Sequence, residues 1–160
     1  MRKKLRAGII ILMLLGITSS CTKKDGLSPF SFSDQNSQIP LGRYQLMFYE
    51  DVNEVPYEII LEVKGPANPE GDYLINGRSV VNFYFSTTRI EATQKAFAVN
   101  SLGSTKIGGN LEELEFESDY FERLSAVQQF ELKSEGKNLI LYPGGSKESF
   151  MTFKRAELPQ

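Results

Sequence analysis

Residues 57–64 read YEIILEVK, and this stretch indicates the class of fold. Apolar side chains occupy every second position, which is typical of a β-strand that buries one face. The predicted buried face consists of Tyr57, Ile59, Leu61 and Val63. The opposite face carries two glutamates, a lysine and Ile60. A strand of this kind needs neighbouring strands, and the sequence on both sides supplies them.

Further strands are predicted along the rest of the chain. Residues 43–50, 72–75, 79–86, 128–133, 138–142 and 149–154 favour strands, and 91–99 favours a strand at its end or a short helix. Predicted turns lie at 65–71, at Asn76-Gly77, at 135–138 and at 143–146. The expected core, with Val81, Phe83 and Phe85 on one face of a strand, comprises Val81, Phe83, Phe85, Phe97, Phe116, Phe121, Phe130, Phe150 and Phe153.

One helix is predicted over residues 110–127. Phe116, Tyr120, Leu124 and Val127 recur at three- and four-residue spacing. Asn110 with Glu113 has the spacing of a capping box. Strands on both sides of one late helix predict a β-rich α+β domain, in which a curled antiparallel sheet or partly open β-barrel packs on one α-helix.

Acidic residues crowd this helix. They lack the loop spacing and turning glycine of a calcium site, so we interpret them as a solvated helix face. Nothing singles out a carboxylate pair for glycosidase-like catalysis. The run comprises Glu112, Glu113, Glu115, Glu117, Asp119 and Glu122.

Composition excludes several kinds of chemistry. The chain has 160 residues, a net charge of −2, one Cys and no His. Without His there can be no Ser-His-Asp or Cys-His nucleophilic site and no zinc site that uses His. A single Cys excludes an intramolecular disulfide. The charge argues against nucleic acid as a partner, and we predict no catalytic residue, no metal site and no cofactor.

Residues 1–20 have the pattern of a lipoprotein signal peptide. Basic residues precede an apolar run from Ala7 to Ile17, which is shorter than the roughly 20 residues that span a bilayer. Small residues then lead to Cys21, and this order resembles the lipobox of bacterial lipoproteins, although Thr18 stands where many have Leu. We predict that Cys21 is lipidated and holds the chain in the membrane. The alternative is an ordinary signal peptide that ends beside a chance cysteine.

Cleavage before Cys21 would leave residues 21–40 as a flexible tether and 41–156 as the domain. It removes four basic and no acidic residues, so 14 Lys+Arg and 20 Asp+Glu remain, a net charge of −6. Attachment to the membrane must then come from the lipid, because a chain this acidic is not drawn to anionic lipid. Thr22 after the cysteine resembles outer-membrane sorting in enteric bacteria, and Lys23-Lys24-Asp25 resembles a surface-export signal of Bacteroidota. We expect an outer-membrane lipoprotein on the periplasmic or the surface face.

Five segments follow one another in a characteristic order. They are LGRYQL at 41–46, GRSVVNFY at 77–84, LGSTKIGG at 102–109, ESDYFERL at 117–124, and a strand pair with a Gly turn within 129–142. Together they resemble the META domain, also called the HslJ-like family of bacterial envelope lipoproteins. The resemblance covers about residues 41–155. It implies a compact, partly open β-structure with one helix and no established enzymatic activity. The family is linked to heat-shock induction, antibiotic tolerance and motility.

The chain departs from this family at three places. The family often has Trp where Tyr44 stands, Gly-Cys-Asn where Val80-Val81-Asn82 stand, and a second Cys near Ile107. Both cysteines are absent here, so the disulfide that they could form is absent too. The resemblance makes Asn82, Thr105 and Lys106 candidate binding residues near the barrel mouth. Alternatively, Asn82 and Thr105 only make local hydrogen bonds to turns and sheet edges.

Three functional hypotheses remain open at this point. We expect a lipid-anchored, non-catalytic envelope protein that acts through contacts with a protein partner or in a stress response. The second hypothesis is a carrier with a lipocalin-like cavity for a small apolar ligand, and the third is an enzyme that uses carboxylates. A filled interior with an exposed apolar patch would favour partner binding. A large cavity would favour the carrier, and a buried carboxylate with a raised pKa would favour the enzyme. The oligomeric state is left open.

Overall fold

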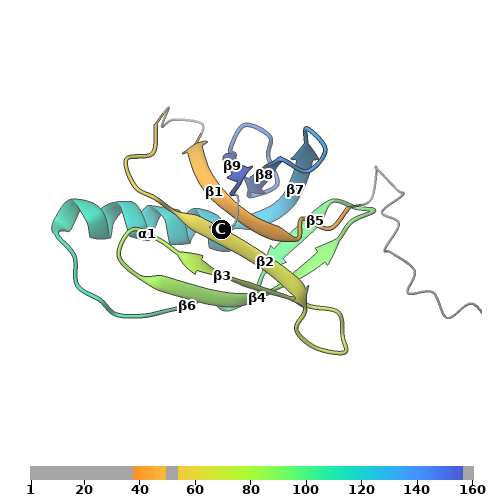
Figure 1. The fold of residues 1–160 in the computed structure, drawn as a ribbon, viewed down its shortest axis with the longest axis horizontal. Coiled ribbons are helices and arrows are strands. Elements are labelled where there is room, and N and C mark those ends of the chain that lie inside the picture. Colours follow the sequence, from red (N-terminus) through yellow and green to blue (C-terminus); the bar gives the residue numbers. More distant parts are fainter. Residues whose placement is uncertain (1–37, 50–53, 157–160) are drawn as a thin grey trace, which may run out of the picture. The chain divides into compact units, whose positions relative to one another are not determined.

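The computed structural model describes residues 38–49 and 54–156, which lie within the compact unit Phe32–Gln160. Cys21, the predicted signal peptide and most of the predicted tether lie outside the described residues. The described residues form nine strands and one helix (Figure 1). In chain order these are β1 (Gly42–Tyr49), β2 (Ile60–Pro66), β3 (Tyr73–Arg78), β4 (Phe83–Glu91), β5 (Ala96–Val99), β6 (Gly103–Ser104), α1 (Leu111–Ser125), β7 (Val127–Lys133), β8 (Asn138–Pro143) and β9 (Met151–Arg155).

Eight of these strands close into an antiparallel barrel. Neighbours around it follow the order β3-β2-β1-β9-β8-β7-β5-β4, and β4 pairs again with β3. The short β6 pairs with the part of β4 that β5 leaves free. The β-rich α+β class with one helix is therefore confirmed. The barrel is closed rather than partly open, because the β3–β4 hairpin pairs along the whole length of β3, from Tyr73↔Thr88 to Arg78↔Phe83.

The helix lies beside the weakest pairing of the barrel. Between β5 and β7 there is a single register pair, Ala96↔Gln129, together with a 2.9 Å hydrogen bond from Phe130 N to Lys95 O. Helix α1 contacts β5 on one side of this pairing and β8, the neighbour of β7, on the other, and it lies beside the barrel strands in Figure 1. The helix thus packs on the barrel where the sheet is least continuous.

Helix α1 begins with the predicted capping box. Glu113 N donates to Asn110 Oδ1 at 2.9 Å, and Asn110 N donates to Glu113 Oε2 at 2.9 Å. The two bonds satisfy backbone donors that the first turn of a helix leaves free. Tyr120 and Leu124 are fully buried, as their spacing predicts, but Val127 already belongs to β7.

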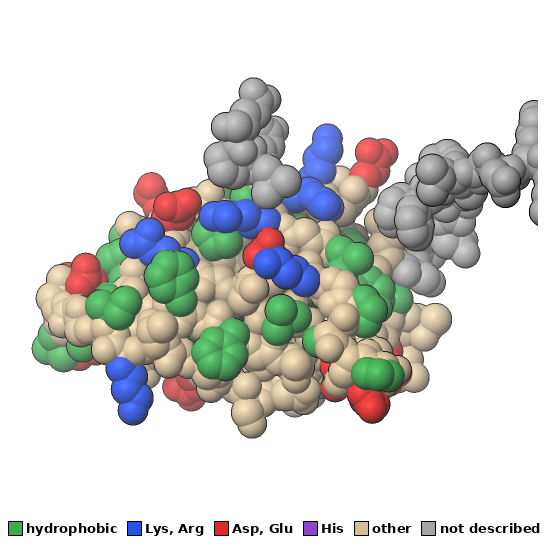
Figure 2. Space-filling view, turned by 60° about the horizontal axis from the view of Figure 1, so that its bottom comes forward, with side chains coloured by type: hydrophobic (Ala, Val, Ile, Leu, Met, Phe, Trp, Pro, Cys, Tyr) green, Lys and Arg blue, Asp and Glu red, His purple; other side chains and the backbone are tan. Residues whose placement is uncertain are grey.

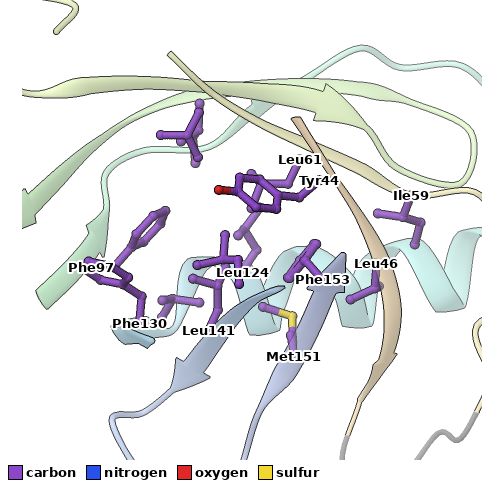
Figure 3. Close-up of a cluster of buried hydrophobic side chains, with 14 of the residues drawn as sticks. Tyr44, Leu46, Ile59, Leu61, Phe97, Leu124, Phe130, Leu141, Met151 and Phe153 are labelled. Atoms are coloured by element: carbon purple, nitrogen blue, oxygen red, sulfur yellow. The ribbon is translucent and has the colours of Figure 1, made fainter. Parts of the chain in front are cut away.

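Large side chains fill the interior of the barrel. Figure 3 shows part of this cluster, to which β1, β2, β5, β7, β8, β9 and α1 all contribute labelled side chains. Tyr84 and Tyr120 meet inside it, with their hydroxyl oxygens 2.6 Å apart, and Tyr84 Oη donates to Ile60 O at 2.8 Å. Burial raises the pKa of both tyrosines, so both are protonated at neutral pH. The fully buried large side chains include Tyr44, Leu46, Tyr49, Ile59, Leu61, Ile75, Phe97, Leu139 and Phe153.

Asn76 and Gly77 lie inside β3, so the hairpin turn predicted there is wrong. The chain turns later, at residues 79–82, and β4 begins at Phe83 rather than at residue 79. Gly77 is required for a different reason. A Cβ atom at this position would lie 1.8 Å from the Ile60 carbonyl oxygen and 2.7 Å from Tyr84 Oη. The glycine therefore makes room for β2 and for the tyrosine pair.

Candidate functional site

The turn between β3 and β4 is held by buried polar groups. Ser79 N donates to the Asn82 carbonyl oxygen at 2.8 Å, and the Ser79 hydroxyl lies 2.7 Å from the same oxygen. Both side chains are nearly inaccessible to solvent, with exposed fractions of 0% for Ser79 and 5% for Asn82. Buried polar groups of this kind need partners, since each unpaired donor or acceptor destabilises the fold.

Glu117 of α1 supplies those partners. Its Oε2 accepts hydrogen bonds from Val81 N at 2.9 Å and Asn82 N at 2.8 Å, and it also contacts the Ser79 hydroxyl. Its Oε1 accepts from Asn82 Nδ2 at 2.5 Å. Glu117 as a whole is 5% exposed. We refer to Ser79, Val81, Asn82 and Glu117 as the Glu117 network. It joins the helix to the β3–β4 turn.

The amide of Asn82 extends this network to the segment after β6. Asn82 Oδ1 accepts from Thr105 Oγ1 at 2.8 Å and from Ile107 N at 2.7 Å. Asn82 Nδ2 also approaches Ile107 O at 3.3 Å. The structure thus brings together Asn82 and Thr105, two of the three candidate binding residues. Lys106 has an exposed side chain and takes no part in the network.

The charge of Glu117 is stabilised where it lies. Burial by itself raises the pKa of this carboxyl group, but the hydrogen bonds from Ser79, Asn82 and Val81 outweigh burial and lower it below the ordinary value of 4.5. A carboxylate with a lowered pKa and four donors is a poor general acid or base at neutral pH. The interpretation of the whole acidic run as a solvated face is therefore wrong for Glu117. Its spacing from Tyr120 and Leu124, three and seven residues, places it on the buried side of α1.

Apart from the Glu117 network, a second candidate for a functional site is the outer face of β4. Phe83 and Phe85 are 58% and 59% exposed, whereas Tyr84 between them is 1% exposed. The prediction that Phe83 and Phe85 belong to the core is therefore wrong, and β4 turns Tyr84, Ser86, Thr88 and Ile90 inward instead. Hydroxyl groups can lie inside because they find backbone acceptors: Thr88 Oγ1 donates to Ala98 O at 2.9 Å and Ser86 Oγ to Ser101 O at 3.1 Å.

The remaining core predictions hold with different degrees of burial. Phe97, Phe130 and Phe153 are buried. Phe116 and Phe121 are partly buried and pack against the core. Val81 and Phe150 are half-buried.

A groove crosses the outside of the barrel from these phenylalanines toward β9. It runs over β4, β3, β2 and β1, and two adjoining hollows that share Arg43, Glu58 and Ile60 make it up. We call it the outer groove. Figure 2 shows basic side chains gathered beside exposed apolar ones on this face, with acidic side chains among them. The groove is lined mainly by Arg43, Gln45, Glu58, Ile60, Glu62, Asn76, Arg78, Phe83, Phe85 and Lys154.

The described residues also bear on metal binding and on membrane insertion. They contain no group of three or more side chains arranged to hold a metal ion. They also contain no helix with the length and apolar character needed to cross a membrane. The Glu117 network is a candidate structural support, and the outer groove is a candidate binding surface.

Comparison with known proteins identifies a family and a fold. The model of the META domain matches residues 53–157. A protein from Burkholderia xenovorans, solved by NMR, is similar in structure with a TM-score of 0.56 and 14% identity, covering 88% of this chain and 100% of that one. A crystal structure of a DUF4847 family protein from Bacteroides vulgatus has a TM-score of 0.48 and 11% identity, covering 75% and 96% of the two chains. No curated protein matches the chain.

Proposed function

The chain belongs to the META domain family, and from this premise we propose that it is a lipid-anchored, non-catalytic protein of the bacterial cell envelope. In this proposal the chain acts by binding another protein, and the outer groove is the binding surface. The observation that carries the proposal is the exposed pair Phe83 and Phe85 on a barrel whose interior is filled. Two large aromatic side chains on one strand face are costly to leave in water unless a partner covers them.

The alternatives receive less support. A carrier of a small apolar ligand needs an open interior, and the buried tyrosines, phenylalanines and leucines occupy the interior of this barrel. An enzyme that uses carboxylates is favoured by a buried carboxyl group with a raised pKa, and the pKa of Glu117 is lowered. The arrangement of Glu117 instead suits a support that fixes the β3–β4 turn, from which Phe83 directly follows.

The anchor is proposed from the sequence alone. Cys21, after the predicted signal peptide, would carry acyl chains, and Thr22 would direct the protein to the outer membrane. The experiment is the intact mass of protein extracted from host membranes, with Cys21→Ala beside it. We expect a chain that begins at Cys21 and carries acyl mass such as palmitate, and no acyl mass in the variant. An unacylated wild-type chain would contradict the anchor. Protease treatment of intact cells then separates the surface face from the periplasmic face.

Partner binding is tested by photo-crosslinking in the host. A photoreactive phenylalanine analogue replaces Phe83 or Phe85 in separate strains, and a third strain carries it at Lys147, an exposed residue outside the groove. We expect a discrete protein adduct from positions 83 and 85 that is missing from position 147. A lack of adducts at both groove positions, with the protein present at normal levels, would contradict the proposal. Comparing the same adducts before and after heat stress tests the stress-related role.

A further inference from the structure

The side chains of the outer groove form two rows across the sheet. In register across the sheet, one row reads Lys154, Gln45, Ile60, Arg78 and Phe83 from β9 to β4. The next row reads Arg43, Glu62, Asn76 and Phe85. Side chains in register on paired strands share a face, so each row ends in an exposed phenylalanine and contains an arginine.

The two phenylalanines at the apolar end of the groove contact β6 and the residue that follows it. A Cβ atom at Gly103 of β6 would lie 2.7 Å from the ring of Phe85, so the ring lies directly on this glycine. Phe83 N donates to Thr105 Oγ1 at 3.2 Å and Thr105 N donates to Phe83 O at 3.0 Å, which fixes the strand at the second ring. The side chain of neither phenylalanine has a polar atom, so an apolar side chain of a partner is suited to cover each ring.

Three cations of the groove, Arg43, Arg78 and Lys154, form no ion pair within 4 Å among the described residues. Among the described residues, ion pairs form between Lys64 and Glu62, Arg89 and Asp72, Arg123 and Asp119, and Lys133 and Glu131. No such pair within this part of the chain includes Arg43, Arg78 or Lys154. These three cations outnumber the two carboxylates of the groove, Glu58 and Glu62, although the whole chain has a net charge of −2. Arginine and aromatic side chains are also the residues enriched at the centres of protein interfaces.

Two carboxylates narrow the choice of partner further. Glu58 and Glu62 line the same groove between the cations. A uniformly anionic polymer such as a nucleic acid or a polyphosphate would place charge against both of them. A protein segment that alternates acidic and apolar residues avoids this conflict. The strands beneath are already paired on both sides, so side chains rather than backbone hydrogen bonds must recognise the segment.

We propose that the outer groove binds an extended acidic segment of a partner protein. Carboxylates of the segment pair with Arg43 and Arg78, and an apolar side chain lies against Phe83 and Phe85. This inference rests on the proposed function, because it names the chemistry of the partner that the groove would bind.

The test uses protein purified from the host envelope and a library of random 12-residue peptides displayed on phage. We expect selection to enrich peptides in which acidic and apolar residues alternate. The most enriched peptide is then synthesised with a fluorescent label, and its binding is followed by anisotropy. Charge reversal in Arg43→Glu or Arg78→Glu is expected to weaken binding about tenfold or more, and added salt to weaken it too. Lys147→Glu makes the same charge change outside the groove and is expected to leave binding within about twofold.

Several results would overturn the inference. One is enrichment of basic or uncharged peptides, and another is binding that Arg43→Glu and Arg78→Glu leave unchanged. Binding of polyphosphate or of phosphatidylglycerol vesicles in place of peptides would assign the groove to an anionic polymer or a lipid surface. Concentration-dependent self-association that Arg78→Glu abolishes would assign it to a second copy of the chain. A crosslinked partner whose contact segment is not acidic would overturn this inference alone, whereas a lack of crosslinks would remove the proposed function as well.

Discussion

Asn82 Nδ2 donates a 2.5 Å hydrogen bond to Glu117 Oε1, and Asn82 N donates to the other oxygen of the same carboxylate at 2.8 Å. One residue of the β3–β4 turn thus occupies both oxygens of a charged group on α1. The helix contributes a negative charge and the turn contributes the donors, so neither is satisfied without the other. This relationship explains why an acidic side chain occupies a buried position on the helix.

The first prediction concerns the charge of Glu117. Glu117→Gln keeps the size of the side chain but removes the charge and sets an amide among four donors. We expect a loss of about 2 kcal/mol in the free energy of unfolding. The reason is that hydrogen bonds to a charged group contribute about 1.5–3 kcal/mol to stability. Urea unfolding followed by circular dichroism measures it. Glu115→Gln on the exposed face of the same helix is the control, with an expected change within about 0.5 kcal/mol. Equal effects of the two variants would contradict this account.

The second prediction concerns pH. The pKa of Glu117 is lower in the folded protein than its ordinary value of 4.5, so below that value the unfolded chain takes up the proton first. Stability from this group is therefore fully present above about pH 5 and is lost as the pH falls through the folded pKa. Urea unfolding between about pH 7 and pH 3 should show a steeper loss for the wild type than for Glu117→Gln. Parallel curves for the two proteins would refute the assignment. Asp72 and Glu131 also have lowered pKa values, and their contribution is common to both proteins.

The third prediction concerns Gly77. In Gly77→Ala the added methyl group would overlap the Ile60 carbonyl oxygen, so β2 and β3 must separate locally. We expect a loss of about 3 kcal/mol, at the upper end of what overpacking costs. Gly65→Ala is the matched control in β2, because a Cβ atom there has no neighbour within 4 Å. Thermal unfolding of the two variants checks the difference. A stable Gly77→Ala protein would show that the β2–β3 spacing is wider than described.

The fourth prediction separates the two faces of β4. Replacing Phe83 and Phe85 together by Ser is expected to change the free energy of unfolding by less than about 1 kcal/mol, because both rings are mostly exposed. Tyr84→Ala opens a cavity in the core and is expected to cost about 3–5 kcal/mol. Urea unfolding of both variants gives the comparison. A double Ser variant as unstable as Tyr84→Ala would place the phenylalanines in the core, as the sequence pattern had predicted, and would remove the basis of the outer groove.

Much of the framework could be predicted from the sequence. Alternation placed Ile59, Leu61 and Val63 in the core, and the Asn110–Glu113 spacing identified the start of the helix. These signals succeeded because they depend on neighbours within one element. The closure of the barrel depends on β3 meeting β4 on one side and β2 on the other, and no local pattern encodes such pairing.

The two features of the candidate site were the ones that local pattern misjudged. Alternation in β4 defines two faces but does not show which of them is buried. Because Phe83 and Phe85 are more hydrophobic than Tyr84, Ser86 and Thr88, the sequence predicted the wrong face to be buried. The buried hydroxyl groups are possible only because backbone carbonyl groups lie within reach. Glu117 could have been found, because it shares the helical stripe of Tyr120 and Leu124. An acidic residue in an apolar stripe indicates a buried partner, although the sequence does not show that Asn82 is that partner.

The pairing of β1 with β9 has a consequence for how the domain folds. Tyr44 lies opposite Arg155, so strands from the two ends of the domain must meet before the barrel can close. Contacts between such distant positions slow folding, since the chain loses much entropy before it gains them. A nascent chain that ends short of residue 151 cannot complete the barrel, because it lacks the strand with which β1 pairs. Closure of the barrel is thereby delayed until almost the whole domain has been synthesised.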